Sequence, residues 1–154
     1  MRKLIANPSA SDLLKLDNQI CHSVYSAANA LVRAYRPLLE PLDLTYPQYL
    51  VMLSLWESDG VNIKRISEHT RLDSGTLTPI LKRLEQKALL ERLASPNDER
   101  QKVIVLTSAG KKLRKKAEAI PHQIYCHGIS DLKKIVQLKS LCEEMYQELT
   151  RDDG

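Results

Sequence analysis

Two short helical patterns joined by a tight turn, and followed by two β-prone runs, restrict the fold of this chain more than any other feature. The patterns are NIKRISEHT and LDSGTLTPILKRLEQKALL, and the turn between them carries the cap-forming residues Asp73 and Ser74. Apolar side chains recur at helical spacing in both patterns, as in amphipathic helices that bury one face. Helix, tight turn and helix form the helix-turn-helix arrangement. Pro79 must lie in the first turns of the second helix or bend it, because proline removes a backbone hydrogen bond.

After Leu90 the pattern changes from helical spacing to short runs typical of strands. LLERLA and QKVIVL flank the turn-forming segment SPNDER. A β-hairpin directly after the second helix makes a winged helix-turn-helix, which we expect to span residues 45–106. The chain is therefore predicted to be mainly α with a small β-wing.

Helical patterns flank this unit on both sides, at residues 11–36 and 107–151. The first has two adjoining apolar stripes, and a helix apolar over so wide an arc is covered on more than one side. A partner subunit is one way to provide the second cover. We expect a proline, Pro121, to interrupt the C-terminal helical region. All 154 residues fit one domain with helical extensions.

Charge is unevenly distributed along the chain. The segment Asn62–Lys116 has 14 Lys and Arg against 6 Asp and Glu, whereas the remainder has 9 against 13, and the whole chain has a net charge of +4. A basic middle region suggests contact with a polyanion, although a solvated charged face is the alternative. The sequence has no apolar run of the roughly 18 residues that a membrane span needs, and no signal-peptide core, so we expect a cytoplasmic protein.

The second helix of a helix-turn-helix enters the major groove of DNA, and its N-terminal half meets the base edges. Hydroxyl and basic side chains of this helix are candidates for contacts with bases or phosphates: Ser74, Thr76, Thr78, Lys82 and Arg83. On the wing, Arg100 is suited to a narrow minor groove, and Asp98 can orient it. The alternative is an ordinary amphipathic helix with a solvated face.

Three cysteines, Cys21, Cys126 and Cys142, have no C-x-x-C spacing, and no metal or cofactor site is predicted. In the cytoplasm they are expected to be reduced, catalytic or redox-sensing. A free cysteine is usually a small buried hydrophobe, and we interpret Cys142 in this way. Cys21 has no cation one turn away, and it is expected to lie too far inside its helix to benefit from the helix dipole. The residues around Cys21, taken alone, therefore also favour a structural role for this cysteine.

Several strings of the sequence resemble the MarR family of winged-helix regulators, and more closely its OhrR branch of organic hydroperoxide-sensing repressors. The strings include LDNQIC, LTYPQY, LDSGTLTPILKRLEQKALL and NDERQKVIVLTSAGKKL. The resemblance covers about residues 16–149. It implies a homodimer whose dimerisation helices are about 11–36 and 107–151.

The resemblance also assigns roles to individual residues. It implies that Cys21 reacts with peroxide, and that Tyr35 and Tyr46 of the partner subunit donate hydrogen bonds to its thiolate. A second cysteine of the two-cysteine subtype, which resolves the oxidised one across the dimer, corresponds to Cys126. The branch usually has an aromatic residue after the sensing cysteine, whereas this chain has His22, which affects the shape expected of the peroxide pocket.

We therefore expect a redox-sensing repressor, not an enzyme. Reduced, it would bind double-stranded operator DNA, and oxidation of Cys21 with a disulfide to Cys126 would release it. Two alternatives remain open: a MarR-type repressor gated by a small aromatic ligand, and a thiol peroxidase that uses the same cysteines. Loss of DNA binding that a reducing agent reverses would favour the redox sensor over the ligand-gated repressor. Turnover of many equivalents of hydroperoxide would instead indicate the thiol peroxidase.

Overall fold

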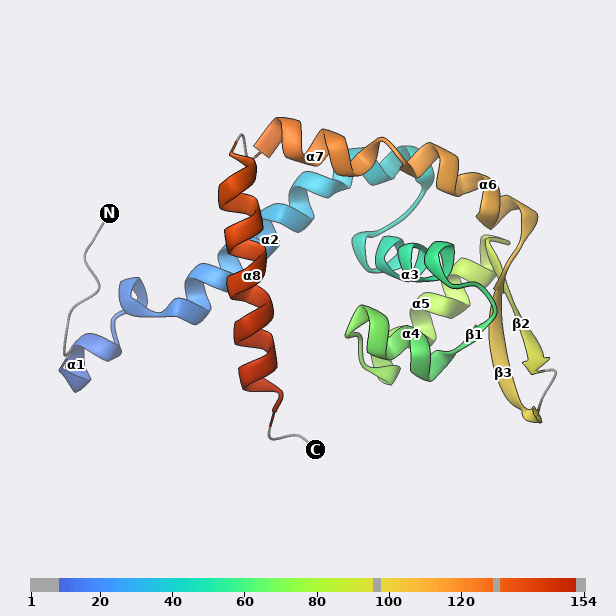
Figure 1. Cartoon of the computed structure of the whole chain (residues 1–154), viewed down its shortest axis with the longest axis horizontal. Coiled ribbons are helices and arrows are strands. Elements are labelled where there is room, and N and C mark those ends of the chain that lie inside the picture. Colours follow the sequence, from blue (N-terminus) through green and yellow to red (C-terminus); the bar gives the residue numbers. More distant parts are fainter. Residues whose placement is uncertain (1–8, 96–97, 129–130, 152–154) are drawn as a thin grey trace. The chain divides into compact units, whose positions relative to one another are not determined.

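The computed structural model describes residues 9–95, 98–128 and 131–151, with the backbone alone for residues 10, 95, 98–101 and 125–128. The chain forms two compact units, Met1–Tyr46 and Pro47–Gly154 (Figure 1). No helix in the described ranges is long and apolar enough to cross a membrane.

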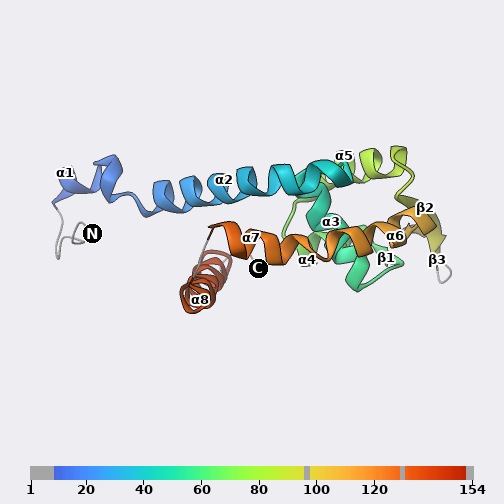
Figure 2. The same cartoon turned by 90° about the horizontal axis from the view of Figure 1, so that it is seen from above.

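The first unit begins with a broken helix. Its elements are α1 (Ala10–Leu13), the 3₁₀ helix η1 (Leu16–Asn18), α2 (Ile20–Leu39) and the 3₁₀ helix η2 (Glu40–Leu42). The prediction of one helix over residues 11–36 is therefore wrong, and Figure 2 shows α1 set off from the long α2. Asn18 Nδ2 donates to the carbonyl oxygen of Asp12 at 2.8 Å, and Gln19 Nε2 donates to that of Leu13. These side chains satisfy the carbonyls at the end of α1, which ends the helix before α2 starts.

Many apolar side chains of the helices outside the winged unit are exposed in the single chain. On the N-terminal side, Leu14 is 87% exposed and Tyr25 70% exposed, and on α8 (Leu132–Leu149) Leu149 is 73% exposed. The others are Leu13, Leu16, Ile20, Leu31, Val32, Leu132, Val136, Leu138 and Leu141. Exposed apolar area of this extent is typical of a surface that another molecule covers.

The second unit contains the predicted winged helix-turn-helix. Its elements are α3 (Tyr46–Glu57), β1 (Val61–Asn62), α4 (Ile63–Thr70), α5 (Ser74–Gln86), β2 (Leu90–Ser95) and β3 (Asp98–Leu106). The sheet is antiparallel in the order β1-β3-β2, with Leu90 opposite Leu106 and Val61 opposite Ile104. The mainly helical fold with a small β-wing is confirmed. The sequence did not indicate β1, because two residues are too few to show an alternating pattern.

The predicted recognition helix, α5, starts and packs for identifiable reasons. Asp73 is its N-cap, and its side chain accepts from the backbone amide of Thr76. One face is buried in the core, through Leu77, Ile80, Leu81 and Leu84. Pro79 is the sixth residue of α5 and lies inside the helix.

Two helices continue from β3 and support the winged unit. Thr107 caps α6 (Ser108–Ala117), and α7 (Ile120–Gly128) follows after a break, with Pro121 at its second position as expected. The start of α6 is fixed to α3, because the Trp56 indole Nε1 donates to the carbonyl oxygen of Gly110 at 2.9 Å. Asp59 accepts from the backbone amide of Leu106 at 2.8 Å and pairs with Lys111 at 3.1 Å.

Candidate functional site

The candidate DNA-reading residues of α5 form one exposed surface, opposite the buried leucines. Ser74, Thr76, Thr78, Lys82 and Arg83 are all exposed. Ser74, Thr78 and Lys82 follow one another at intervals of four residues, so they lie on one side of the helix. The structure therefore brings Ser74, Thr78 and Lys82 together on one side of α5, and it places Thr76 and Arg83 at the other edge of the exposed surface.

Two of the hydroxyls on this surface already donate hydrogen bonds within the helix. Thr76 Oγ1 donates to Asp73 Oδ2 at 2.6 Å, and Thr78 Oγ1 donates to the carbonyl oxygen of Ser74 at 2.9 Å. The hydrogen bonds from Thr76 lower the pKa of Asp73, which keeps the cap ionised at neutral pH. Thr76 and Thr78 can still accept hydrogen bonds and can contact a thymine methyl group.

The wing is tied to the recognition helix. Arg92 on β2 lies 3.4 Å from the Glu85 carboxylate of α5. Asp98 and Arg100 belong to β3, and Asp98 is paired with Ser95 at the tip of the hairpin. The side chains of Asp98 and Arg100 lie outside the described residues, so their orienting contact stays a prediction.

Cys21 lies at the start of a helix and is exposed. It is free and is the second residue of α2, directly after the break at Gln19. The expectation that it lies too deep in its helix is wrong, because the helix that contains Cys21 starts at Ile20 and not at residue 11. The first turn of a helix has unpaired backbone amides and a partial positive charge, which stabilise a negative charge placed there.

Tyr35 and Tyr46 form a ring pair away from this thiol. Their ring centroids are 4.9 Å apart with the planes tilted at 53°. Burial raises the pKa of Tyr46, so its phenol stays protonated at neutral pH and can donate a hydrogen bond. Tyr35 is fourteen positions after Cys21 on α2, which corresponds to about 21 Å along the helix axis. The tyrosines of one chain therefore do not meet the thiol of the same chain.

The other two cysteines differ in what the structure describes. Cys126 belongs to α7, but its side chain lies outside the described residues. Cys142 on α8 is free and exposed in the single chain, so its interpretation as a core residue is wrong. The apolar stripe of α8 that suggested a core position is itself largely exposed, including Leu138.

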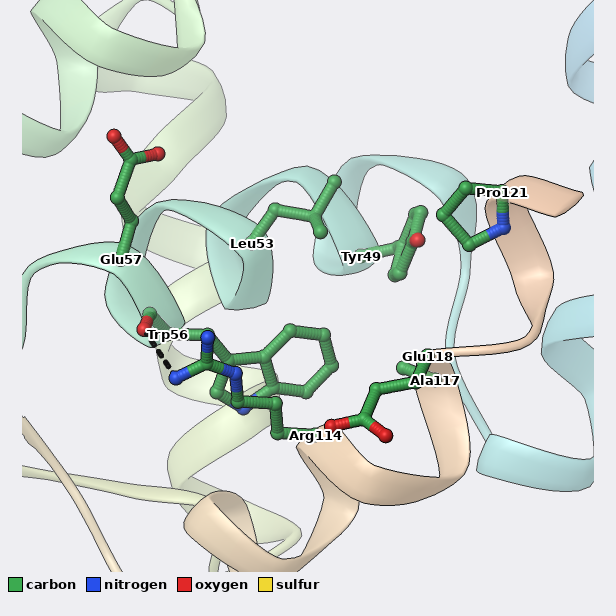
Figure 3. A pocket seen from close by; sticks show the side chains of 8 residues that line it. All are labelled: Tyr49, Leu53, Trp56, Glu57, Arg114, Ala117, Glu118 and Pro121. Atoms are coloured by element: carbon green, nitrogen blue, oxygen red, sulfur yellow. Dashed lines mark hydrogen bonds between the residues drawn. The ribbon is translucent and has the colours of Figure 1, made fainter.

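A hollow of about 290 Å³ lies between α3 and the α6–α7 region, and it was not indicated by the sequence. Figure 3 shows Tyr49 and Leu53 along one side of the hollow, and Arg114 beside the Trp56 indole; Glu118 also lines it. Arg114 Nη1 donates to the carbonyl oxygen of Trp56 at 3.2 Å, which holds the guanidinium at the edge of the hollow. In the part of the chain that the structure describes, no group of three or more His, Cys, Asp or Glu could hold a metal ion.

Comparison with known proteins agrees with this geometry. The MarR family model matches residues 44–102. The organic hydroperoxide resistance transcriptional regulator of Bacillus subtilis (strain 168) is 43% identical over 141 residues, which cover 89% of this chain and 96% of that protein. The chain belongs to the MarR family. It is thus a transcriptional regulator and not an enzyme.

Solved structures of AbfR, known from Staphylococcus epidermidis, are also similar to this chain. Reduced AbfR bound to DNA has a TM-score of 0.72 at 34% identity, over 88% of this chain and 93% of that one. Disulfide-formed AbfR has a TM-score of 0.60 at 34% identity, over 92% of this chain and 94% of that one.

Proposed function

We propose that this MarR-family protein is a homodimeric redox-sensing repressor. Reduced, it binds operator DNA, and it releases the DNA when an organic hydroperoxide oxidises Cys21 and an intersubunit disulfide forms with Cys126. The observation that carries the proposal is the exposed Cys21 thiol in the first turn of α2. The similarity to AbfR, solved both reduced on DNA and with its disulfide formed, supports it.

The DNA-binding part of the proposal rests on α5 and the wing. The exposed side chains of α5 enter the major groove. On the wing, Arg100, oriented by Asp98, contacts the minor groove. A dimer presents two such units, so the operator has two half-sites about one helical turn, roughly 34–36 Å, apart. In this assignment residues 45–106 bind DNA, and the flanking helices, about 11–36 and 107–151, form the dimer.

The redox chemistry balances with the hydroperoxide as the oxidant. The Cys21 thiolate attacks one peroxide oxygen, the O–O bond breaks, and an alcohol leaves with a proton while Cys21 becomes a sulfenic acid. The thiol of Cys126 from the partner subunit then displaces water and forms the disulfide. Two thiols and one hydroperoxide thus give one disulfide, one alcohol and one water.

The tyrosine pair supplies hydrogen bonds to the thiolate in this proposal. Tyr35 and Tyr46 lie together, and the helical separation means that only the partner subunit's pair can approach Cys21. A charge-assisted hydrogen bond contributes about 1.5–3 kcal/mol, so two phenols can favour the reactive thiolate considerably.

A second candidate function has one observation in its favour. The hollow in Figure 3 is lined by the aromatic side chains Tyr49 and Trp56 and by the charged side chains Glu57, Arg114 and Glu118, a combination suited to a small aromatic ligand. In that case a ligand, and not Cys21 oxidation, would release the DNA.

Operator binding distinguishes the two functions. We expect hydroperoxide to weaken operator binding by the wild type by about 100-fold, which corresponds to about 2.7 kcal/mol, and dithiothreitol to restore it. Cys21→Ser should bind the operator with wild-type affinity and show no response to hydroperoxide. A peroxide response that survives in Cys21→Ser would contradict the proposal, and so would release that needs a small aromatic ligand instead of an oxidant.

Removing single cations should test the docking model. Arg83→Ala and Arg100→Ala are each expected to weaken operator binding without unfolding the protein. Loss of one phosphate contact should reduce the slope of log affinity against log salt concentration by about one unit. The measurement is a salt titration of operator binding by fluorescence anisotropy, with circular dichroism to confirm folding. Unchanged affinity and slope in both variants would rule out these contacts.

A further inference from the structure

One side chain of the helix-turn-helix turn contacts the C-terminal helix. Arg71 Nη2 lies 2.5 Å from Glu143 Oε2 on α8, and the Arg71 guanidinium carbon lies 3.8 Å from the centre of the Tyr146 ring. Glu143 and Tyr146 are three residues apart, so they lie on the same side of α8. A planar guanidinium can donate to a carboxylate and stack on a ring at the same time, which a lysine cannot do equally well.

The turn around Arg71 has a fixed backbone. Arg71 is the C-cap of α4 and adopts a left-handed conformation with φ of 58°. Such a conformation is uncommon for a residue other than glycine and persists where the surroundings determine it. Ser67 Oγ donates to the carbonyl oxygen of Leu72 at 2.6 Å, and Thr70 Oγ1 donates to that of Ile66 at 2.7 Å. These hydrogen bonds and the left-handed residue restrain the end of α4 and the turn after it.

The recognition helix starts three residues after Arg71, and its N-cap, Asp73, is two residues after. Asp73 caps α5 through the amide and hydroxyl of Thr76. The residues expected to meet base edges, beginning with Ser74, lie in this first turn. A force on Arg71 from α8 is thus applied directly beside the DNA-reading end of α5.

We propose that Arg71, with Glu143 and Tyr146, is a positioning residue that couples α8 to the recognition helix. It holds the first turn of α5 in the orientation that fits the operator, and it carries movements of α8 to that turn. This inference rests on the proposed DNA-binding function. The hydrogen bond from Arg71 lowers the pKa of Glu143, so the ion pair is present at neutral pH.

Operator affinity of the reduced protein, measured as a function of salt, tests the coupling. We expect Arg71→Ala, Glu143→Gln and Tyr146→Leu each to weaken binding by about 3- to 10-fold, as loss of an exposed ion pair or cation–π contact implies. The slope against salt concentration should not change, because no phosphate contact is lost. Arg71→Ala combined with Glu143→Gln should cost less than the sum of the single changes, because both remove the same contact. Arg71→Lys should recover part of the affinity.

Glu148→Gln is the matched control. It removes the same charge from an exposed position of α8, outside the contact that Arg71 makes with Glu143 and Tyr146, and its affinity should stay within about 2-fold of wild type. If Glu143→Gln strengthens binding, or Arg71→Ala flattens the salt slope, Arg71 contacts phosphate directly and the proposal is wrong. Unchanged affinity in all three single variants would also overturn it.

A readout without DNA separates this inference from the proposed function. Amide hydrogen exchange in residues 71–77 should become faster in Arg71→Ala and Glu143→Gln but not in Glu148→Gln. If the wild type binds no operator, the proposed function fails, and the exchange data still decide whether α8 restrains the turn. Equal exchange in all variants would show that it does not.

Discussion

Treatment with an organic hydroperoxide is expected to give a dimer-sized band on a non-reducing gel, and Cys126→Ser is expected to abolish it. The reason is that the sulfenic acid of Cys21 needs a second thiol, and Cys126 is the proposed partner across the subunits. The effect should be all or none, since a single disulfide either joins the two chains or does not. Gel densitometry against time measures formation of the crosslinked band. Intact mass spectrometry detects the sulfenic or sulfinic acid of Cys21 in the variant that lacks the second thiol.

Cys142→Ser is the matched control, because it removes another thiol and leaves the proposed pair intact. It should crosslink like the wild type. Since Cys142 is free and exposed in the single chain, the opposite result has a clear meaning. A crosslink that persists in Cys126→Ser and disappears in Cys142→Ser would transfer the resolving role to α8.

Gly110→Ala is expected to destabilise the fold more than any surface change. A Cβ atom at this position would lie 2.0 Å from the carbonyl oxygen of Leu89 and 3.1 Å from Leu106 Cδ2. The close neighbour is backbone, so α6 must move away from the wing, which also disturbs the hydrogen bond from Trp56 to Gly110. We expect a loss of about 3 kcal/mol or more in the free energy of unfolding, measured by urea denaturation at fixed protein concentration.

Gly75→Ala provides the comparison within the same domain. Its Cβ would lie 3.1 Å from Asp73 Oδ1, a side-chain atom that can shift. Because Gly75 is in the first turn of α5 and alanine favours helices, the change in stability should be less than about 1 kcal/mol in either direction. Equal destabilisation by the two variants would contradict the packing described for α6.

The sequence predicted those parts of the fold that depend on local patterns. The caps at Asp73 and Thr107, the break before Pro121 and the wing all follow from side chains that act on backbone within a few residues. The buried face of α5 follows from the spacing of Leu77, Leu81 and Leu84, which the structure buries. These features are local, so one sequence is sufficient to predict them.

Features that depend on distant contacts could not be predicted. The break before α2 needs the side chains of Asn18 and Gln19 to reach back to α1. The helical spacing of apolar residues continues across this break and does not indicate it. The apolar stripe of α8 indicated a core position for Cys142, because a pattern cannot distinguish burial in the chain from burial against another molecule. The contact of Arg71 with Glu143 joins residues far apart in sequence, and charge counting does not reveal which of many cations makes it.

The length of α2 has a consequence for when the thiol becomes reactive. About 21 Å of helix lies between Cys21 and Tyr35, so under the proposed function a chain without a partner has a thiol but none of its phenol donors. The contribution of the phenols to reactivity toward peroxide then arises only after two chains associate, so newly made, unpaired chains are oxidised more slowly. Dilution below the dissociation constant of the dimer would slow oxidation of Cys21 and weaken DNA binding together.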